Sequence, residues 1–116
     1  MEYSDSGAVK ISEKVIATIA ATTIAEINGI HLASYKQMKK SNVDRKRDLK
    51  KISVFFDKNG SMVININVLA SYGVKIFDVA KKVQIAVANA VRSITGLNAL
   101  KVNVNITGIN FHVDAV

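Results

Sequence analysis

The clearest pattern in the chain is an alternation of apolar and polar residues in two segments of its second half. In residues 61–70, and again in residues 100–108, the apolar residues repeat at every second position. They are Met62, Ile64, Ile66, Val68 and Ala70 in the first segment, and Leu100, Val102, Val104 and Ile106 in the second. A period of two over five or more residues is typical of a strand with one buried face. The opposite sides carry Asn65, Asn67, Asn103 and Asn105, so asparagines are expected on the exposed face.

Between these strands the apolar residues recur at steps of three and four, from about position 75 to position 96. The residues on this helical stripe are Val79, Val83, Ala86, Val87, Ala90, Val91 and Ile94. The stripe predicts an amphipathic helix that begins near Phe77 or Asp78 and ends at Thr95, with Gly96 stopping it. Packing this helix on the apolar sides of the strands leaves the asparagine sides in solvent.

An earlier helix is predicted from Ser12 to about Asn28. The Ser12 hydroxyl can accept a hydrogen bond from a free amide of the first turn, and Glu13 suits the positive end of the helix dipole. The buried stripe of this helix is predicted to be Ile16, Ile19, Ala20, Thr23, Ile24 and Ile27. Gly29 follows as a left-handed stop. Residues 8–11 alternate weakly and are predicted as a short edge strand.

Residues 51–56 are predicted as one more strand, and residues 57–60, Asp-Lys-Asn-Gly, as the hairpin turn after it, because Asn-Gly readily supplies positive φ angles. The inward residues of this strand are predicted to be Ile52, Val54 and Phe56, and the outward ones Ser53 and Phe55. Ile30 and Leu32 are expected to pack back onto the core.

The element order is therefore (β)αββαβ in a single domain of 116 residues. The predicted fold class is α+β, a two-layer sandwich with two helices packed on one face of a small mixed or antiparallel sheet. The ferredoxin-like arrangement is the default for this order. Because periodicity does not reveal strand order, a KH-like or another sheet order stays open. Residues 1–7 are expected to be a loose N-terminus and residues 33–50 a basic variable loop.

The net charge of +7 is concentrated in one segment, because residues 36–51 carry eight of the sixteen basic side chains and only two acidic ones, a net charge of +6. Such charges on a loop attract polyanions, for example RNA or anionic lipid headgroups. The candidate polyanion-binding residues are Lys39, Lys40, Arg45, Lys46, Arg47, Lys50 and Lys51. A loop that is merely solvated by its charges explains the pattern equally well, and few aromatic residues interleave with the charges to stack on bases.

The outward face of the predicted sheet gives a second hypothesis. Asparagine is disfavoured in strands, and yet four asparagines occupy predicted outward positions there. A partner that hydrogen-bonds to amides, including a second copy of this chain, would explain this choice, and so would a plain solvated face. The candidate partner-binding residues are Asn65, Asn67, Asn103, Asn105 and Phe55. An RNA-recognition motif would use this face for RNA, but its aromatic pattern is missing.

The sequence offers little for catalysis, and no catalytic, cofactor-binding or metal-binding residue is predicted. His31 and His112 lie far apart, without acids at ligand spacing, and the chain has no cysteine for disulfides or thiolate metal sites. The protein is therefore expected not to be an enzyme and to need no cofactor. No apolar run approaches the ~20 residues that span a bilayer, and the polar first ten residues show no signal peptide. A cytoplasmic location is expected, with peripheral membrane association through a partner as an option.

Three sequence blocks resemble the alkaline shock protein family of Gram-positive bacteria, the envelope stress response proteins. The pattern G-x-V-x-I-S-x-x-V-I-x-x-I-A matches Gly7, Val9, Ile11, Ser12, Val15, Ile16, Ile19 and Ala20. The pattern Y-G-V-x-I-x-x-V-A-x-x-V-Q matches Tyr72, Gly73, Val74, Ile76, Val79, Ala80, Val83 and Gln84. The pattern T-G-L-x-x-x-x-V-N-V-x-I matches Thr95, Gly96, Leu97, Val102, Asn103, Val104 and Ile106. Family members often carry proline where Phe77 stands and an acidic residue where Thr22 and Thr23 stand.

The resemblance implies a cytosolic, non-enzymatic protein of cell-envelope homeostasis or the general stress response. Some family members associate with the membrane through an integral partner, and some are linked to fatty-acid metabolism. No role transfers to the basic segment 36–51, which falls in the variable region of the family. The first functional hypothesis is therefore an interaction or scaffold protein that self-associates or docks to a membrane-anchored partner. The alternative is a polyanion-binding module that uses the basic segment.

Overall fold

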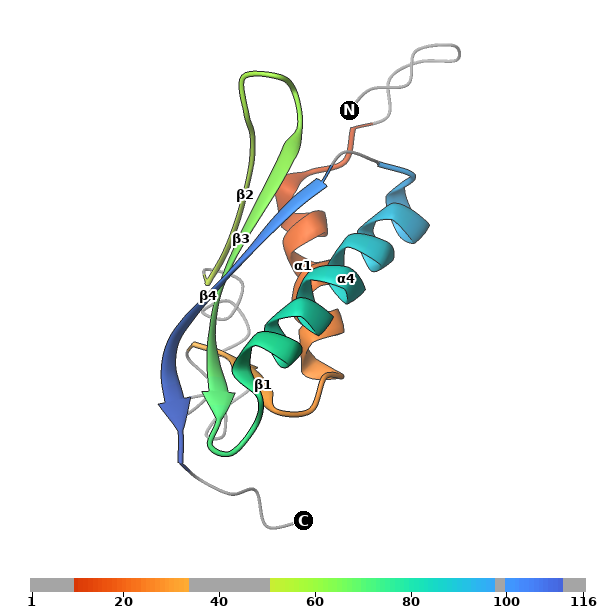
Figure 1. Cartoon of the computed structure of the whole chain (residues 1–116). Helices are drawn as coiled ribbons and strands as arrows, with labels where there is room; N and C mark the ends of the chain where they lie inside the picture. The colour runs from red at the N-terminus through yellow and green to blue at the C-terminus, as the bar shows by residue number, and fades with distance from the viewer. Residues whose placement is uncertain (1–9, 34–50, 98–99, 112–116) are drawn as a thin grey trace.

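The computed structural model describes residues 10–33, 51–97 and 100–111. The elements in these residues are α1 (Glu13–Ala25), β1 (Ile30–Leu32), β2 (Ile52–Phe56), β3 (Met62–Ser71), α4 (Ile76–Thr95) and β4 (Leu100–Asn110). Both helices lie on the same face of the sheet, so the chain forms the expected two-layer α+β sandwich (Figure 1). The predicted order of helices and longer strands is confirmed, with β1 as an additional short strand between α1 and β2.

Strand β3 lies at the centre of a mixed sheet. Strand β4 runs parallel to β3 along its full length, from Met62 opposite Leu100 to Ser71 opposite Asn110. Strands β1 and β2 both run antiparallel to β3, and they share its other edge because β4 occupies the first. The ferredoxin-like default is therefore wrong, because that sheet is antiparallel, whereas α4 leads the chain from β3 directly into a parallel neighbour.

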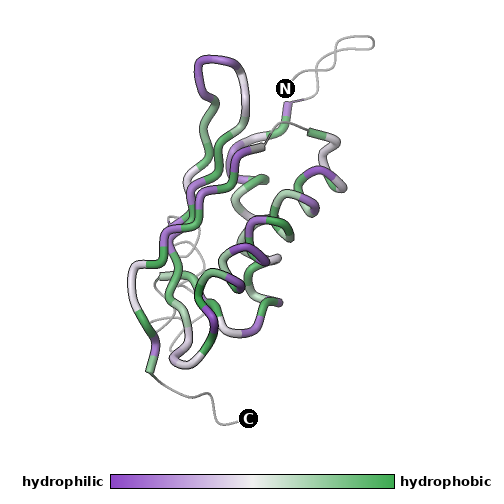
Figure 2. The backbone as a smooth tube through the Cα atoms, in the orientation of Figure 1, coloured by the Kyte–Doolittle hydropathy of each residue, from purple (hydrophilic) through white to green (hydrophobic). Residues whose placement is uncertain are grey.

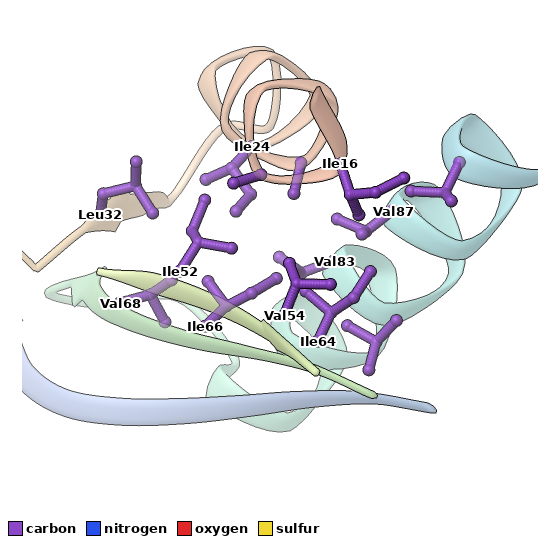
Figure 3. Packing of buried hydrophobic residues seen from close by; sticks show 14 of the residues in the cluster. Ile16, Ile24, Leu32, Ile52, Val54, Ile64, Ile66, Val68, Val83 and Val87 are labelled. Carbon is purple, nitrogen blue, oxygen red and sulfur yellow. The ribbon is translucent and has the colours of Figure 1, made fainter. Parts of the chain in front are cut away.

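The alternation predicted for the central strand is confirmed in the core. Its inward side chains, from Met62 to Ala70, are at most 3% exposed. They pack against Val83 and Val87 of α4 and against Ile16 and Ile24 of α1 (Figure 3). In residues 64–68 of β3 and residues 101–107 of β4, apolar and polar residues alternate in hydropathy (Figure 2). The period of two thus places one apolar side of each strand beneath the helices.

Local signals set the ends of the helices. The Ser12 hydroxyl accepts a hydrogen bond from the Val15 amide at 3.3 Å, which confirms the predicted N-cap. Helix α4 ends at Gly96, whose φ is 76° and whose amide donates to the Arg92 carbonyl at 2.8 Å. Helix α1 is shorter than predicted, because Glu26 is already its C-cap, and Gly29 lies in the turn that follows, with a φ of 91°.

Several predicted positions differ in the structure. Phe56, predicted to point into the core, is 49% exposed as the last residue of β2, next to the hairpin turn. Ile94, predicted on the buried stripe, is 67% exposed in the last turn of α4. Lys10 and Ile11 are not in a strand, and the rest of the strand predicted at 8–11 lies outside the described residues.

A β-bulge interrupts the pairing of β3 with β4. Val68 lies opposite Ile106 and Leu69 opposite Gly108, so Thr107 is the extra residue. The Thr107 hydroxyl donates to the Val68 carbonyl at 3.2 Å. After the bulge the alternation reverses, so that Ile109 and not Gly108 faces the core beside Ala70. Strand β4 continues past the predicted segment 100–108 as far as Asn110.

Candidate interaction surface

The sheet face that points away from the helices is the surface with the most distinctive polar chemistry, and we call it the outer face. The strand registers arrange its side chains in rows, namely Phe55–Val63–Lys101, Ser53–Asn65–Asn103, Asn67–Asn105 and His31–Leu69. In the described part of the chain no helix covers this face (Figure 1). The five candidate partner-binding residues therefore come together on one surface, as the alternation predicted.

The asparagines of this face form two hydrogen-bonded pairs between β3 and β4. The Asn103 side-chain amide donates to Asn65 Oδ1 at 2.8 Å, and the Asn105 amide donates to Asn67 Oδ1 at 3.1 Å. Both pairs form because the parallel register places these residues directly opposite each other. Cross-strand pairs of this kind contribute about 0.2–1 kcal/mol each, which offsets part of the poor strand propensity of asparagine.

The pairing changes the interpretation of these residues. Asn103 and Asn105 are exposed, whereas Asn65 and Asn67 are only half-exposed, so the outer face is less open than the sequence predicted. Each side-chain amide offers two N–H donors and an oxygen with two lone pairs. Since each asparagine pair uses one donor and one acceptor, hydrogen-bonding capacity remains for a partner.

An apolar residue lies beside these amides. Phe55 is 45% exposed and faces Val63 across the strand pair. Asn65 lies two residues beyond Val63, so Phe55 and Asn65 are diagonal neighbours on the outer face. Val63 itself is only 5% exposed. The outer face thus combines an aromatic side chain with fixed amide groups.

The candidate polyanion-binding residues cannot be placed in the same way. Of these, only Lys51 lies in the described part of the chain, and it is half-buried immediately before β2. Its backbone carbonyl accepts a hydrogen bond from the backbone N–H of Asn67 at 3.1 Å. The residues outside the described part are Lys39, Lys40, Arg45, Lys46, Arg47 and Lys50.

A groove between α4 and β4 is a feature that sequence reasoning missed. Its lining residues are Ile76, Phe77, Ala80, Lys81, Gln84, Val104 and Ile106. The Gln84 side-chain amide donates to the Val102 carbonyl at 3.1 Å and so ties the helix to the strand. Phe77, in the first turn of α4, is 88% exposed. The sequence predicted that Phe77 lies near the start of a helix, but it did not predict that its side chain is exposed.

Two further aromatic residues meet where β3 and β4 end. The rings of Tyr72 and Phe111 have centroids 5.2 Å apart, and the side chains are 68% and 69% exposed. The Tyr72 amide donates to the Asn110 carbonyl at 2.9 Å, which holds the two chain segments together. This contact joins residues 39 positions apart, so no local sequence pattern could have revealed it.

The groups with potential for chemistry are dispersed in the structure. The described residues contain no group of three or more His, Cys, Asp and Glu side chains that could hold a metal ion. His31 Nε2 lies 3.4 Å from Ser71 Oγ on the outer face, and His112 lies outside the described residues. Asp57 caps the hairpin turn, since its Oδ1 accepts from the Asn59 and Ser61 amides at 2.9 Å. Among the described helices, none has the length and hydropathy needed to cross a membrane.

The fold and its outer face define a small two-layer α+β domain with an amide-rich sheet surface. Residues 1–111 match the model of the alkaline shock protein 23 family, which has a cell envelope-related function. The chain belongs to this family, as the three sequence blocks predicted.

The curated relatives are of similar length. An uncharacterized protein of Streptococcus pyogenes serotype M6, Spy1614, is 32% identical over 106 residues, which cover 89% of this chain and 88% of the relative. The uncharacterized protein YloU of Bacillus subtilis strain 168 is 30% identical over 106 residues, with the same coverage of 89% and 88%. A second Streptococcus pyogenes serotype M6 protein, Spy1535, is 29% identical and is also uncharacterized. No solved structure matches the fold significantly.

Proposed function

We propose that this chain is a non-enzymatic interaction protein in cell-envelope homeostasis, and that it binds a protein partner through its outer face. Membership of a family with a cell envelope-related function supports the cellular context. The observation that carries the proposed binding role is the pair of asparagine bridges beside exposed Phe55 on a sheet face without a described helix over it. General stress and fatty-acid metabolism are the processes to which the family resemblance points.

The chemistry of the outer face suits protein binding. Interfaces are typically anchored by a few aromatic residues with polar groups around them. Phe55 supplies such an anchor, and Asn65 is its diagonal neighbour. The hydrogen bond from Asn103 fixes the Asn65 side chain before any partner arrives. Less side-chain entropy is then lost on binding, which favours affinity.

The proposed partner is a membrane-anchored protein, and the chain would then be a cytoplasmic protein held peripherally at the membrane. This arrangement would connect a family with an envelope-related function to a chain whose described helices do not cross a membrane. The proposal assigns this contact to the outer face, because the buried apolar residues of the helices, such as Ile16 and Val83, are already used in the core.

Photo-crosslinking in cells tests the proposal. A photo-reactive amino acid replaces Phe55 on the outer face, and, as the matched control, the exposed Thr22 on α1. We expect position 55 to crosslink to an envelope protein, and Phe55→Ser to reduce the fraction of the chain that sediments with the envelope. Crosslinks from position 22 alone, or none from position 55, would contradict the assignment of the outer face. A product with twice the chain's mass would report only self-association.

A further inference from the structure

Strand β4 has one edge that pairs with β3 and another that pairs with no described strand. It is 11 residues long, which is long for an edge strand. Unpaired edges are templates for another strand, and proteins usually guard them with prolines, charges or short length. Strand β4 contains no proline and a single charged residue, Lys101. Its bulge at Thr107 lies near one end, so residues 101–106 remain regular.

The sequence of this edge is self-complementary. Residues 101–107 read Lys-Val-Asn-Val-Asn-Ile-Thr, and their side-chain types mirror each other about Val104. In an antiparallel pair related by a two-fold axis at Val104, Asn103 lies opposite Asn105 of the second copy. Val102 then lies opposite Ile106, and Lys101 opposite Thr107. Amides therefore meet amides, apolar residues meet apolar residues, and no two like charges meet.

We propose that two copies of this chain associate through β4, antiparallel and with the two-fold axis at Val104, so that one continuous sheet crosses both copies. A two-fold contact of this kind uses the same surface on both copies. It adds an interaction beyond the proposed function, because it uses the edge of the sheet and leaves Phe55 to the envelope partner.

The outer face favours this arrangement. Asn103 uses one amide hydrogen to reach Asn65, so the hydrogen-bonding capacity of its second N–H and of its Oδ1 remains for other partners. In the paired copies, a row of amides runs from Asn65 through Asn103 to Asn105 and Asn67 of the second copy. Such amide ladders stabilise stacked strands, and their members here are already bonded pairwise.

The inner face favours it as well. Val104 and Ile106 are only half-buried and line the groove beside α4. The axis stands perpendicular to the sheet, so the α4 helices of both copies lie on the same side and the half-buried residues of both copies meet beneath them. Apolar area that is accessible in one chain is then removed from water. Gln84 uses only one of the two lone pairs of the Val102 carbonyl, so it does not block an added strand.

Sedimentation velocity on the full chain tests the proposal. The mass of one chain is 12.6 kDa, and we expect wild-type protein to reach twice that mass as its concentration rises. Asn103→Lys/Asn105→Lys places lysine opposite lysine twice and should raise the dissociation constant about tenfold or more. Asn103→Glu/Asn105→Lys places glutamate opposite lysine twice and should restore it to within about threefold of wild type.

The glutamate–lysine variant also tests the register. A two-fold axis at residue 103 would place glutamate opposite glutamate, and an axis at residue 105 would place lysine opposite lysine. The control Thr18→Lys/Thr22→Lys adds the same charge on exposed positions of α1 and should leave association unchanged. Wild-type protein with the mass of one chain at every concentration would overturn the proposal. So would an unaffected lysine variant, or a glutamate–lysine variant as weak as the lysine one. Envelope crosslinks from position 55 of wild-type protein, recorded separately from the sedimentation result, test the proposed function independently of this association.

Discussion

Gly29 connects the end of α1 to β1, and replacing it with alanine should destabilise the fold in two separable ways. Its φ of +91° is a left-handed conformation that side chains adopt at a cost. An added Cβ would also lie 2.9 Å from Val74 Cγ1, which is closer than carbon atoms normally approach. The backbone cannot easily move away, because the Gly29 carbonyl accepts from the Ser71 amide at 2.9 Å.

The two costs can be estimated separately. A left-handed residue with a Cβ costs roughly 1–2 kcal/mol. If the contact is relieved by an off-rotamer shift of Val74, the cost is about 0.5–1.5 kcal/mol. We therefore expect Gly29→Ala to lower the free energy of unfolding by about 1.5–3.5 kcal/mol, a large part of the stability of a small domain.

Urea unfolding followed by circular dichroism measures this loss, and Gly73→Ala is the matched control. Gly73 has a φ of +95°, and a Cβ built there would meet nothing within 4 Å. The control should therefore show only the conformational cost of about 1–2 kcal/mol. In a Val74→Ala background the additional cost at Gly29 should disappear. Equal losses at Gly29 and Gly73, or a loss at Gly29 that Val74→Ala does not change, would refute the steric explanation.

Three further predictions concern the hairpin, the core and the basic segment. Asp57→Ala removes the acceptor of two turn amides and should cost about 1–2 kcal/mol in unfolding free energy, whereas Asp57→Asn should retain most of it. Ile66→Ala, at a position that is 0% exposed, should cost about 2–5 kcal/mol. Ile94→Ala, at 67% exposed, should stay within about 0.5 kcal/mol, and equal losses at both would contradict the burial pattern. Neutralising four basic side chains should weaken binding to RNA or anionic vesicles and flatten its salt dependence, if the segment binds polyanions, and unchanged binding would exclude it. The four are Lys46, Arg47, Lys50 and Lys51.

The sequence predicted those parts of the fold that depend on local periodicity. Strand β3 alternates from Ile64 to Ser71 in burial, and its inward side chains are buried as expected. Ser12 and Gly96 are cap residues whose chemistry acts within one turn, and both cap helices as predicted. The order of strands could not be predicted, because the alternation of apolar and polar residues within a strand is the same whether its neighbour is parallel or antiparallel. Strand β1 has only three residues, too few for a recognisable period.

The sequence predicted which residues form the candidate surface, but it did not predict the hydrogen bonds between them. Alternation alone placed Asn103 and Asn105 on the outer face, and the structure has them there. Their bonds to Asn65 and Asn67 depend on the parallel register of strands that are 38 residues apart in sequence. Phe77 lines a groove because the fold places α4 beside β4, and the local sequence around Phe77 does not show this. Properties that depend on how distant segments meet are absent from any local pattern.

The inner face of the sheet contributes mainly to folding, and the outer face carries the groups that suit interactions. On the inner face, residues such as Ile64 and Ile66 are fully buried beneath the helices, so changes there act on folding. On the outer face the bridging amides contribute at most about 1 kcal/mol per pair, and strands with threonine in their place would have a higher intrinsic propensity. Stability alone therefore gives little reason to place asparagine at these positions. Two of these amides, those of Asn103 and Asn105, lie on β4 beside the edge with no described neighbour, which is where hydrogen-bonding groups can be used by another chain.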